Sequence, residues 1–242
     1  MHQEKRIINH PSSIINLQGR FIVLDGPDGC GKSSQARLLM EWLHGQGVAT
    51  AGFRDPGATV IGEKIREILL SPAHETMTTP TEVLLYMAAR VQLWAEHLKP
   101  SLEEGKCVVM DRWLSSTCAY QGYAGAFGMD KVIEIAQASL ERIWPDLTII
   151  LDVDLQTAAR RLNRELDRME RKGPDYHGRV RAGFLQLARG RPDFAVVDAT
   201  GSLEATHREV LAAVQRQLAG GLSGVVRSHG RSSPGTDRDD ST

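Results

Sequence analysis

The segment 21–33, FIVLDGPDGCGKS, joins a short apolar run to a glycine-rich loop that ends in Gly-Lys-Ser. Residues 26–33 satisfy the pattern G-x-x-x-x-G-K-S/T, and a helical stretch follows over residues 32–46. This pattern between a strand and a helix predicts a phosphate-binding loop. Its glycines let backbone N–H groups converge on phosphate oxygens, and the helix N-terminus adds its positive dipole. We therefore expect the chain to bind ATP and to move a phosphoryl group.

The loop residues have expected tasks. Lys32 is expected to reach the β- and γ-phosphates, and Ser33 to ligate Mg²⁺. The loop alone does not choose between a kinase, a GTPase and a motor, although the sequence has no N-K-x-D segment of the GTPase type and is short for a motor. The expected ATP-binding residues are Gly26, Pro27, Asp28, Gly29, Cys30, Gly31, Lys32, Ser33 and Ser34.

Apolar runs similar to the first recur along the chain, at residues 48–53, 107–110, 148–153 and 194–197. Between them lie helical stretches at about 61–70, 81–104, 130–142, 155–170, 176–188 and 203–218. Short apolar strands that alternate with helices indicate a parallel sheet buried on both faces. The sequence therefore predicts an α/β fold of the P-loop NTPase type, with three α/β/α layers around a five-stranded parallel sheet.

The composition indicates which partners, which location and which domain organisation to expect. The 242 residues carry a formal net charge of −1, which gives no global field for nucleic acid or an anionic membrane. Its three cysteines form no C-x-x-C pair, and no run of about 18 apolar residues occurs. We expect a cytoplasmic protein without nucleic-acid or membrane partners. Residues 1–18 form an N-terminal extension, 19–218 a single domain, and the Gly- and Ser-rich 219–242 a disordered tail.

Five separated segments carry a more specific signal: DGPDGCGKSSQ (25–35), FRDPGAT (53–59), LLYMAARVQLW (84–94), DRWLSSTCAYQG (111–122) and ELDRMERKGPDYHGRVRAGFLQLA (165–188). Together they resemble the thymidylate kinases, and the similarity covers about residues 19–218. The resemblance implies ATP-dependent phosphorylation of dTMP to dTDP with Mg²⁺, and it implies a homodimer.

Asp111 and Arg112 follow the apolar run 107–110, at the carboxyl end of a strand. Open α/β sheets place their ligand crevice at this edge. The resemblance implies that Arg112 binds the acceptor phosphate, and we expect Asp111 to hold hydrated Mg²⁺ beside Ser33. The alternative is a structural ion pair at the end of the strand.

Tyr86 and Arg90 are four residues apart on a predicted helix, so they share one face. The resemblance implies that Tyr86 stacks on thymine and that Arg90 bonds its O4; the alternative is a core tyrosine with a snorkelling arginine. It also implies that the ring of Tyr120 lies beneath the sugar. The other residues expected near the acceptor are Arg54 as a second cation for its phosphate, Thr117 and Gln121 at the base or sugar, Ser116 as a packing or capping residue, and Asp28 at the sugar or the transferred group.

Phosphoryl transfer requires positive charge around the moving group, and an arginine there is worth about 10³–10⁵ in rate. Some thymidylate kinases carry this arginine in the phosphate loop directly after the aspartate, where this chain has Gly29. The arginine-rich segment 160–181 resembles the helical lid that supplies it instead, although such a run is more often a solvated helix face. We expect Arg168 to be the catalytic arginine, with Arg164 second. The expected catalytic residues are thus Lys32, Arg112, Arg168, Arg164 and Asp28.

Two alternatives stay open. The acceptor could be another deoxynucleoside monophosphate, or the chain could be a non-catalytic, regulatory nucleotide-binding module. The presence of Lys32, Ser33, Asp111 and Arg112 argues against the second alternative.

Overall fold

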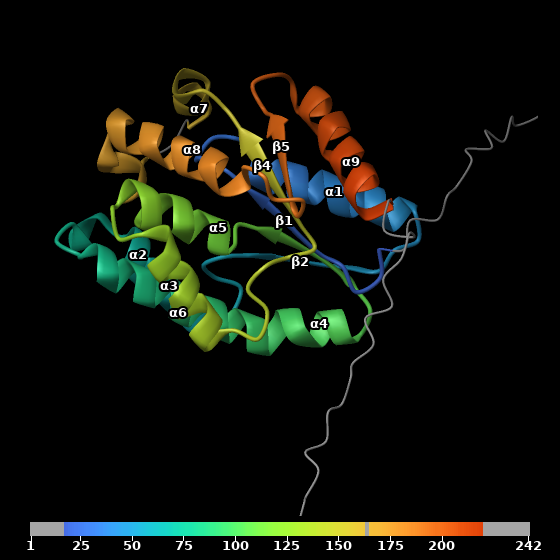
Figure 1. Ribbon diagram of the computed structural model, residues 1–242, viewed down its shortest axis with the longest axis horizontal. Coiled ribbons are helices and arrows are strands. Elements are labelled where there is room, and N and C mark those ends of the chain that lie inside the picture. The colour runs from blue at the N-terminus through green and yellow to red at the C-terminus, as the bar shows by residue number, and fades with distance from the viewer. Residues whose placement is uncertain (1–16, 163–164, 220–242) are drawn as a thin grey trace, which may run out of the picture.

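A parallel sheet of five strands forms the centre of the computed structural model, which describes residues 17–162 and 165–219 (Figure 1). The strand order is β2-β3-β1-β4-β5. In chain order the strands are β1 (Phe21–Asp25), β2 (Thr50–Arg54), β3 (Cys107–Asp111), β4 (Leu147–Asp152) and β5 (Phe194–Asp198). The predicted α/β class and five-stranded parallel sheet are confirmed. The expected N-terminal extension and C-terminal tail lie almost wholly outside the described residues.

Helices cover both faces of the sheet (Figure 1), and an apolar core fills the space between the sheet and the helices on each face. Successive residues of β1 point to opposite faces, so Phe21 and Val23 enter one core whereas Ile22 and Leu24 enter the other. On the second face lie α1 (Lys32–Gly45) and α9 (Leu203–Ala219). On the first lie α3 (Thr79–Leu93), α6 (Met129–Ser139) and α8 (Pro174–Ala188). This arrangement confirms the three predicted layers.

The predicted helix 81–104 is interrupted. The chain runs from α3 through a π-helical turn, η2 (Trp94–Leu98), into the short α4 (Lys99–Glu103). Pro100 has no N–H group to donate to the preceding turn, so the regular hydrogen-bond pattern cannot continue through it. The α2 helix (Val60–Leu70) starts at Thr59, whose side chain accepts from the Gly62 N–H group, and η1 (Pro72–His74) follows it.

A helical segment not predicted from the sequence follows β3. It consists of α5 (Leu114–Thr117) and a π-helical continuation, η3 (Cys118–Ala124). Nearly all of its residues are buried, so it lacks the one-sided apolar stripe by which a surface helix is recognised. The segment carries Ser116, Thr117, Tyr120 and Gln121 past the carboxyl edge of the sheet.

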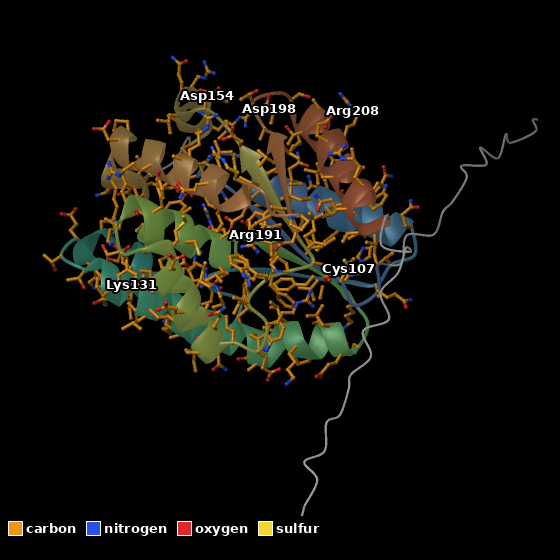
Figure 2. All side chains as sticks on the ribbon, in the orientation of Figure 1. Cys107, Lys131, Asp154, Arg191, Asp198 and Arg208 are labelled. Atoms are coloured by element: carbon orange, nitrogen blue, oxygen red, sulfur yellow. The ribbon has the colours of Figure 1, made fainter. Side chains whose placement is uncertain are left out.

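The predicted helix over 155–170 is wrong in its second half. The side chain of Asp154, which is labelled in Figure 2, caps the N-terminus of α7 (Leu155–Arg161). The helix ends before Leu162. Asn163 and Arg164 lie outside the described residues. Farther on, the carboxylate of Asp167 accepts from the N–H groups of Met169 and Glu170 at 2.9 and 3.0 Å, a local turn that competes with helix. A 3₁₀ turn, η4 (Glu170–Lys172), then leads through Gly173 into α8.

No helix in the described ranges combines the length and the apolar character that crossing a membrane requires.

Candidate active site

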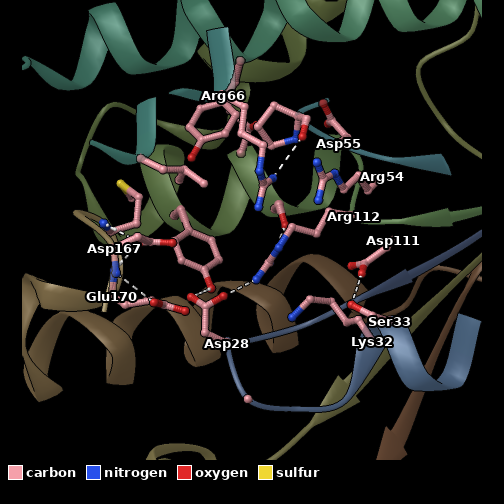
Figure 3. Close-up of a pocket in the computed structure, with 18 of the residues that line it drawn as sticks. Asp28, Lys32, Ser33, Arg54, Asp55, Arg66, Asp111, Arg112, Asp167 and Glu170 are labelled. Atoms are coloured by element: carbon pink, nitrogen blue, oxygen red, sulfur yellow. Dashed lines mark hydrogen bonds and ion pairs between the residues drawn. The ribbon is translucent and has the colours of Figure 1, made fainter. Parts of the chain in front are cut away.

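A cleft of about 330 Å³ opens at the carboxyl ends of β1, β2 and β3. The phosphate loop forms one side, and α3, η3 and residues 167–170 form the others. Figure 3 shows Lys32 and Ser33 on the loop side, Arg54 and Arg66 on the opposite side, and Arg112 between them with its guanidinium at Asp28. Every residue that the sequence predicted to contact the acceptor lines this one cleft: Asp28, Arg54, Tyr86, Arg90, Arg112, Ser116, Thr117, Tyr120 and Gln121.

The Lys32 ammonium lies inside the phosphate loop. Its Nζ donates to the carbonyl oxygens of Gly26 at 3.1 Å and Pro27 at 2.7 Å, and it lies 3.5 Å from Cys30 Sγ. The α1 helix begins at Lys32 itself, so the helix dipole and the ammonium charge act at the same place.

A second cavity, of about 340 Å³, also touches the phosphate loop. It is lined by Gly29, Cys30, Gly31, Ser34, Gln35, Arg161, Gly201, Leu203 and Thr206.

Gly29 cannot carry a side chain in this arrangement. Its φ is +77°, in the left-handed region that favours glycine, and a Cβ placed on it would collide with the carbonyl oxygen of Ala158 in α7. The α7 helix therefore occupies the space that a side chain of the loop would need. An arginine at this position would displace α7, which gives a steric reason for its absence.

Ser33 and Asp111 meet at the end of β3, as predicted. Ser33 Oγ donates to Asp111 Oδ2 at 2.5 Å. Mg²⁺ prefers such hard oxygen ligands, and it usually keeps several waters and takes one or two protein ligands together with substrate phosphates. The hydroxyl and the carboxylate beside the phosphate loop thus fit Mg²⁺. The described residues contain no group of three or more His, Cys, Asp or Glu side chains that would hold a metal ion without a nucleotide.

Asp28 joins the loop to the acceptor side of the cleft. One of its carboxylate oxygens accepts from Arg112 Nη2, and the other accepts from the Tyr120 hydroxyl at 2.6 Å. Burial alone would raise the pKa of Asp28, but the charges of Arg112 and Lys32 and the Tyr120 hydrogen bond lower it to about 2. Asp28 is therefore ionised at neutral pH, and its charge fixes both partners.

Arg112 occupies a strained and tightly held position. Its φ of +72° is rare for a residue with a side chain and costs about 1–3 kcal/mol in general. Its Nη1 donates to the Gly26 carbonyl at 3.1 Å and to Ser116 Oγ at 3.0 Å, while Ser116 in turn donates to Asp25 at 2.6 Å. The turn after β3 thus directs the guanidinium to the phosphate loop, and the Ser116 hydroxyl helps to hold it there.

The guanidinium groups of Arg54, Arg66 and Arg112 all line the cleft. Arg54 pairs with Glu63 at 2.8 Å. Among the described residues, the only hydrogen-bond acceptor that Arg66 reaches is the Pro56 carbonyl, at 3.0 Å. Burial and the nearby charge of Arg54, with a smaller effect of Arg112, lower the pKa of Arg66. Such mutual repulsion marks a place suited to an anion. Arg66 was not predicted from the sequence. The one feature that could have indicated it is the position of a cationic residue between the apolar residues of α2.

Arg90 is buried, with 1% of its surface exposed, and most of its nitrogens are occupied. Its Nε and Nη2 donate to Asp55, and Nη2 also reaches Thr117 Oγ1 at 3.0 Å. In the described residues Nη1 has only the sulfur of Met87, at 4.0 Å. The hydroxyl of Thr117 thus positions Arg90. The guanidinium keeps Nη1 as the donor for a bound molecule, near the half-buried Tyr86 on the same helix.

Arg168 does not reach the phosphate loop in this structure. Its side chain is 4% exposed and donates through Nη1 to Glu82 at 2.6 Å and through Nε to the Leu69 carbonyl at 2.7 Å. It does not line the cleft, although its neighbours Asp167 and Met169 do. The arrangement gives Arg168 a structural task that its position in an arginine-rich segment did not indicate. Arg164 cannot be compared with it because Arg164 lies outside the described residues.

Replacing Arg168 by alanine is expected to lower the free energy of unfolding by about 3 kcal/mol, because a buried charge on Glu82 loses its main partner. Urea unfolding followed by circular dichroism measures the effect. The matched control is Arg171→Ala, which removes an exposed arginine from the adjacent turn and should cost at most about 0.5 kcal/mol. Unchanged stability together with a fall in kcat of about 100-fold would instead support a catalytic arginine.

Comparisons with known proteins give the family of the chain. The family model described as thymidylate kinase matches residues 24–210. A thymidylate kinase of Thermoanaerobacter sp. (strain X514) is 39% identical over 204 residues, covering 84% of this chain and 100% of that protein. One from Symbiobacterium thermophilum is 42% identical over 200 residues, covering 82% and 94%.

The crystal structure of thymidylate kinase from Ehrlichia chaffeensis superposes with a TM-score of 0.67 at 28% identity, covering 82% of this chain and 99% of that one. Sequence, fold and the arrangement of the cleft thus lead to one assignment. The chain belongs to the thymidylate kinase family.

Proposed function

We propose that this protein transfers the γ-phosphoryl group of ATP to dTMP and releases ADP and dTDP. The observation that carries this proposal is the one cleft that the phosphate loop shares with the guanidinium groups of Arg54, Arg66 and Arg112. The loop suits the phosphates of the donor, and the cations suit the phosphate of the acceptor. Both phosphates would therefore lie within one space, with Asp28 and Arg112 between them.

The acceptor needs little chemical activation. A phosphate monoester is already ionised at neutral pH, so its oxygen can attack without a protein base. Catalysis then consists of holding the two groups in line and stabilising charge on the transferred phosphoryl group. Lys32 and Arg112 supply that charge beside the phosphate loop, where both donate to the Gly26 carbonyl. Mg²⁺ held by Ser33 and Asp111 would neutralise charge on the donor phosphates.

We assign the selection of the base to the part of the cleft that Tyr86 and Arg90 line. The Nη1 group of Arg90, whose partner among the described residues is the Met87 sulfur at 4.0 Å, would donate to thymine O4, a position where cytosine presents an amino donor instead. The Tyr86 ring would stack on the base, and the Tyr120 ring, held by Asp28, would lie under the sugar. These roles rest on the positions of the three side chains around the cleft.

The source of the catalytic arginine stays a prediction. Arg168 would have to leave Glu82 and the Leu69 carbonyl to reach the donor phosphates. Arg164, the second candidate, lies outside the described residues. Both arginines therefore stay candidates for this task.

We also propose a homodimer formed through α2 and α3, which pack against each other. Large apolar side chains that these two helices expose are Val60, Ile61, Ile68 and Leu84. A surface of this kind is typical of a protein–protein contact. Light scattering on the purified protein checks this: twice the chain mass is expected, and a single chain mass at micromolar concentration would contradict it. A cytoplasmic location also stays a prediction.

An acceptor panel tests the proposed substrate. With ATP and Mg²⁺, ADP release should be fastest with dTMP, slower with dUMP, and near background with dCMP and dGMP. The low rate expected with dCMP follows from the Arg90 donor, which the amino group at position 4 of cytosine leaves unpaired. Equal rates with dTMP and dCMP would contradict the role given to Arg90 and favour a broader nucleoside monophosphate kinase.

A further inference from the structure

Glu82 on α3 is a buried carboxylate at the meeting point of three other segments. It is 1% exposed. Its Oε1 accepts from Arg168 Nη1 at 2.6 Å and from Lys172 Nζ at 3.0 Å. Its Oε2 accepts from the side-chain Nε2 of Gln121 at 2.9 Å. The two oxygens therefore face different partners, cations on one side and an amide of the cleft on the other.

The charge of Glu82 is well supported. Burial raises the pKa of such a group, but the hydrogen bonds from Arg168 and Gln121 and the charge of Lys172 lower it below its usual range. Glu82 is thus ionised at neutral pH. An ionised carboxylate has no proton and can only accept hydrogen bonds.

This charge determines which end of the Gln121 amide faces Glu82. Only the NH₂ group can donate to a carboxylate, so the amide oxygen must turn the other way. Gln121 is 1% exposed and lines the cleft. No hydrogen bond from the described residues reaches its Oε1 atom. The amide oxygen is therefore the acceptor that Gln121 has left for a molecule in the cleft.

We propose that Glu82 is a positioning residue that sets base specificity by fixing the direction of the Gln121 amide. The inference rests on the proposed function, because it concerns the acceptor base. An oxygen facing the cleft accepts from the ring N3–H of thymine. Cytosine has a lone pair at N3 and would meet that oxygen unfavourably. Arg168 and Lys172 then act on selectivity from outside the cleft, because they hold the charge of Glu82.

The substitution Glu82→Gln should reverse the amide. Arg168 and Lys172 both require an acceptor, so they hold the oxygen of a glutamine at position 82. The NH₂ group then replaces Oε2 and becomes a donor toward Gln121. Gln121 has to turn its own oxygen to that donor and present NH₂ to the cleft, which suits cytosine rather than thymine.

The test compares dTMP with 5-methyl-dCMP, which differs from it only at N3 and position 4 of the base. In Glu82→Gln, the ratio of kcat/KM for dTMP over 5-methyl-dCMP should fall by about 10-fold or more, the effect of one mispaired buried hydrogen bond. The control is Glu96→Gln, since Glu96 also accepts from a glutamine amide, Gln92 Nε2 at 2.9 Å, but is exposed and away from the cleft. Its ratio should match that of the unaltered protein.

A second variant, Gln121→Leu, separates a positioning role of Glu82 from a simple loss of structure. In Gln121→Leu the ratio should already be low, and adding Glu82→Gln should not change it further, because Glu82 acts through that amide. If Glu82→Gln alone does not fold, a Gln121→Leu protein that keeps the original ratio overturns the proposal. So does a folded Glu82→Gln protein in which both acceptors lose activity equally. Absence of dTMP kinase activity in the unaltered protein would instead overturn the proposed function.

Discussion

Replacing Arg112 by methionine is expected to lower kcat/KM for dTMP by about 10³-fold, within the range that an arginine supplies in phosphoryl transfer. The change removes the guanidinium that bridges the phosphate loop and the acceptor side. It also leaves the Asp28 carboxylate facing the phosphates without the charge of Arg112, which is the largest of the charges that lower the pKa of Asp28. Steady-state kinetics with dTMP as the varied substrate measure the effect.

The double variant Arg112→Met/Asp28→Asn separates these two causes. Removing the repelling carboxylate should recover part of the lost activity, although not all of it, because the guanidinium is still missing. Arg37→Met is the control, since Arg37 is an exposed arginine of α1 that pairs with Glu41. Activity of Arg112→Met close to that of this control would show that Arg112 is only a structural ion pair at the strand end.

The second large effect is expected for Lys32→Met, with kcat lower by about 10²–10³-fold, as for the loss of one preorganised charge at a transition state. The side chain is 7% exposed and its ammonium lies within the loop that cradles the phosphates. Lys32→Arg should be nearly as poor, because a planar guanidinium does not reproduce the compact ammonium that donates to both the Gly26 and Pro27 carbonyls.

Lys64→Met serves as the matched control for Lys32, since it removes an exposed lysine that pairs with Glu67 on α2. Its kcat should equal that of the unaltered protein. Full activity of Lys32→Arg would contradict the tight enclosure of the ammonium. Thermal unfolding of each variant checks that a loss of rate does not come from a loss of fold.

The parts of the fold that the sequence predicted depend on local pattern. The run FIVLD, the loop and α1 are adjacent in the chain, and each apolar strand is recognisable by itself. The acceptor residues were identified through the resemblance of five segments. The structure brings them to one cleft because parallel strands all end at the same edge.

The parts that the sequence did not predict depend on contacts between distant segments. The Arg168–Glu82 pair joins residues 86 positions apart, so nothing near Arg168 distinguishes it from a solvated arginine. The approach of Ala158 to Gly29 likewise depends on how α7 packs. Arg66 was missed because a cation on an amphipathic helix usually faces solvent.

The most direct test of the central claim is the product balance of one reaction containing ATP, Mg²⁺, dTMP and the unaltered protein. Chromatography with mass detection should find dTDP and ADP formed in equal amounts, with almost no inorganic phosphate. ADP and inorganic phosphate without dTDP would identify an ATPase. No ADP above background would identify a non-catalytic nucleotide-binding protein, and either result would contradict phosphoryl transfer to dTMP.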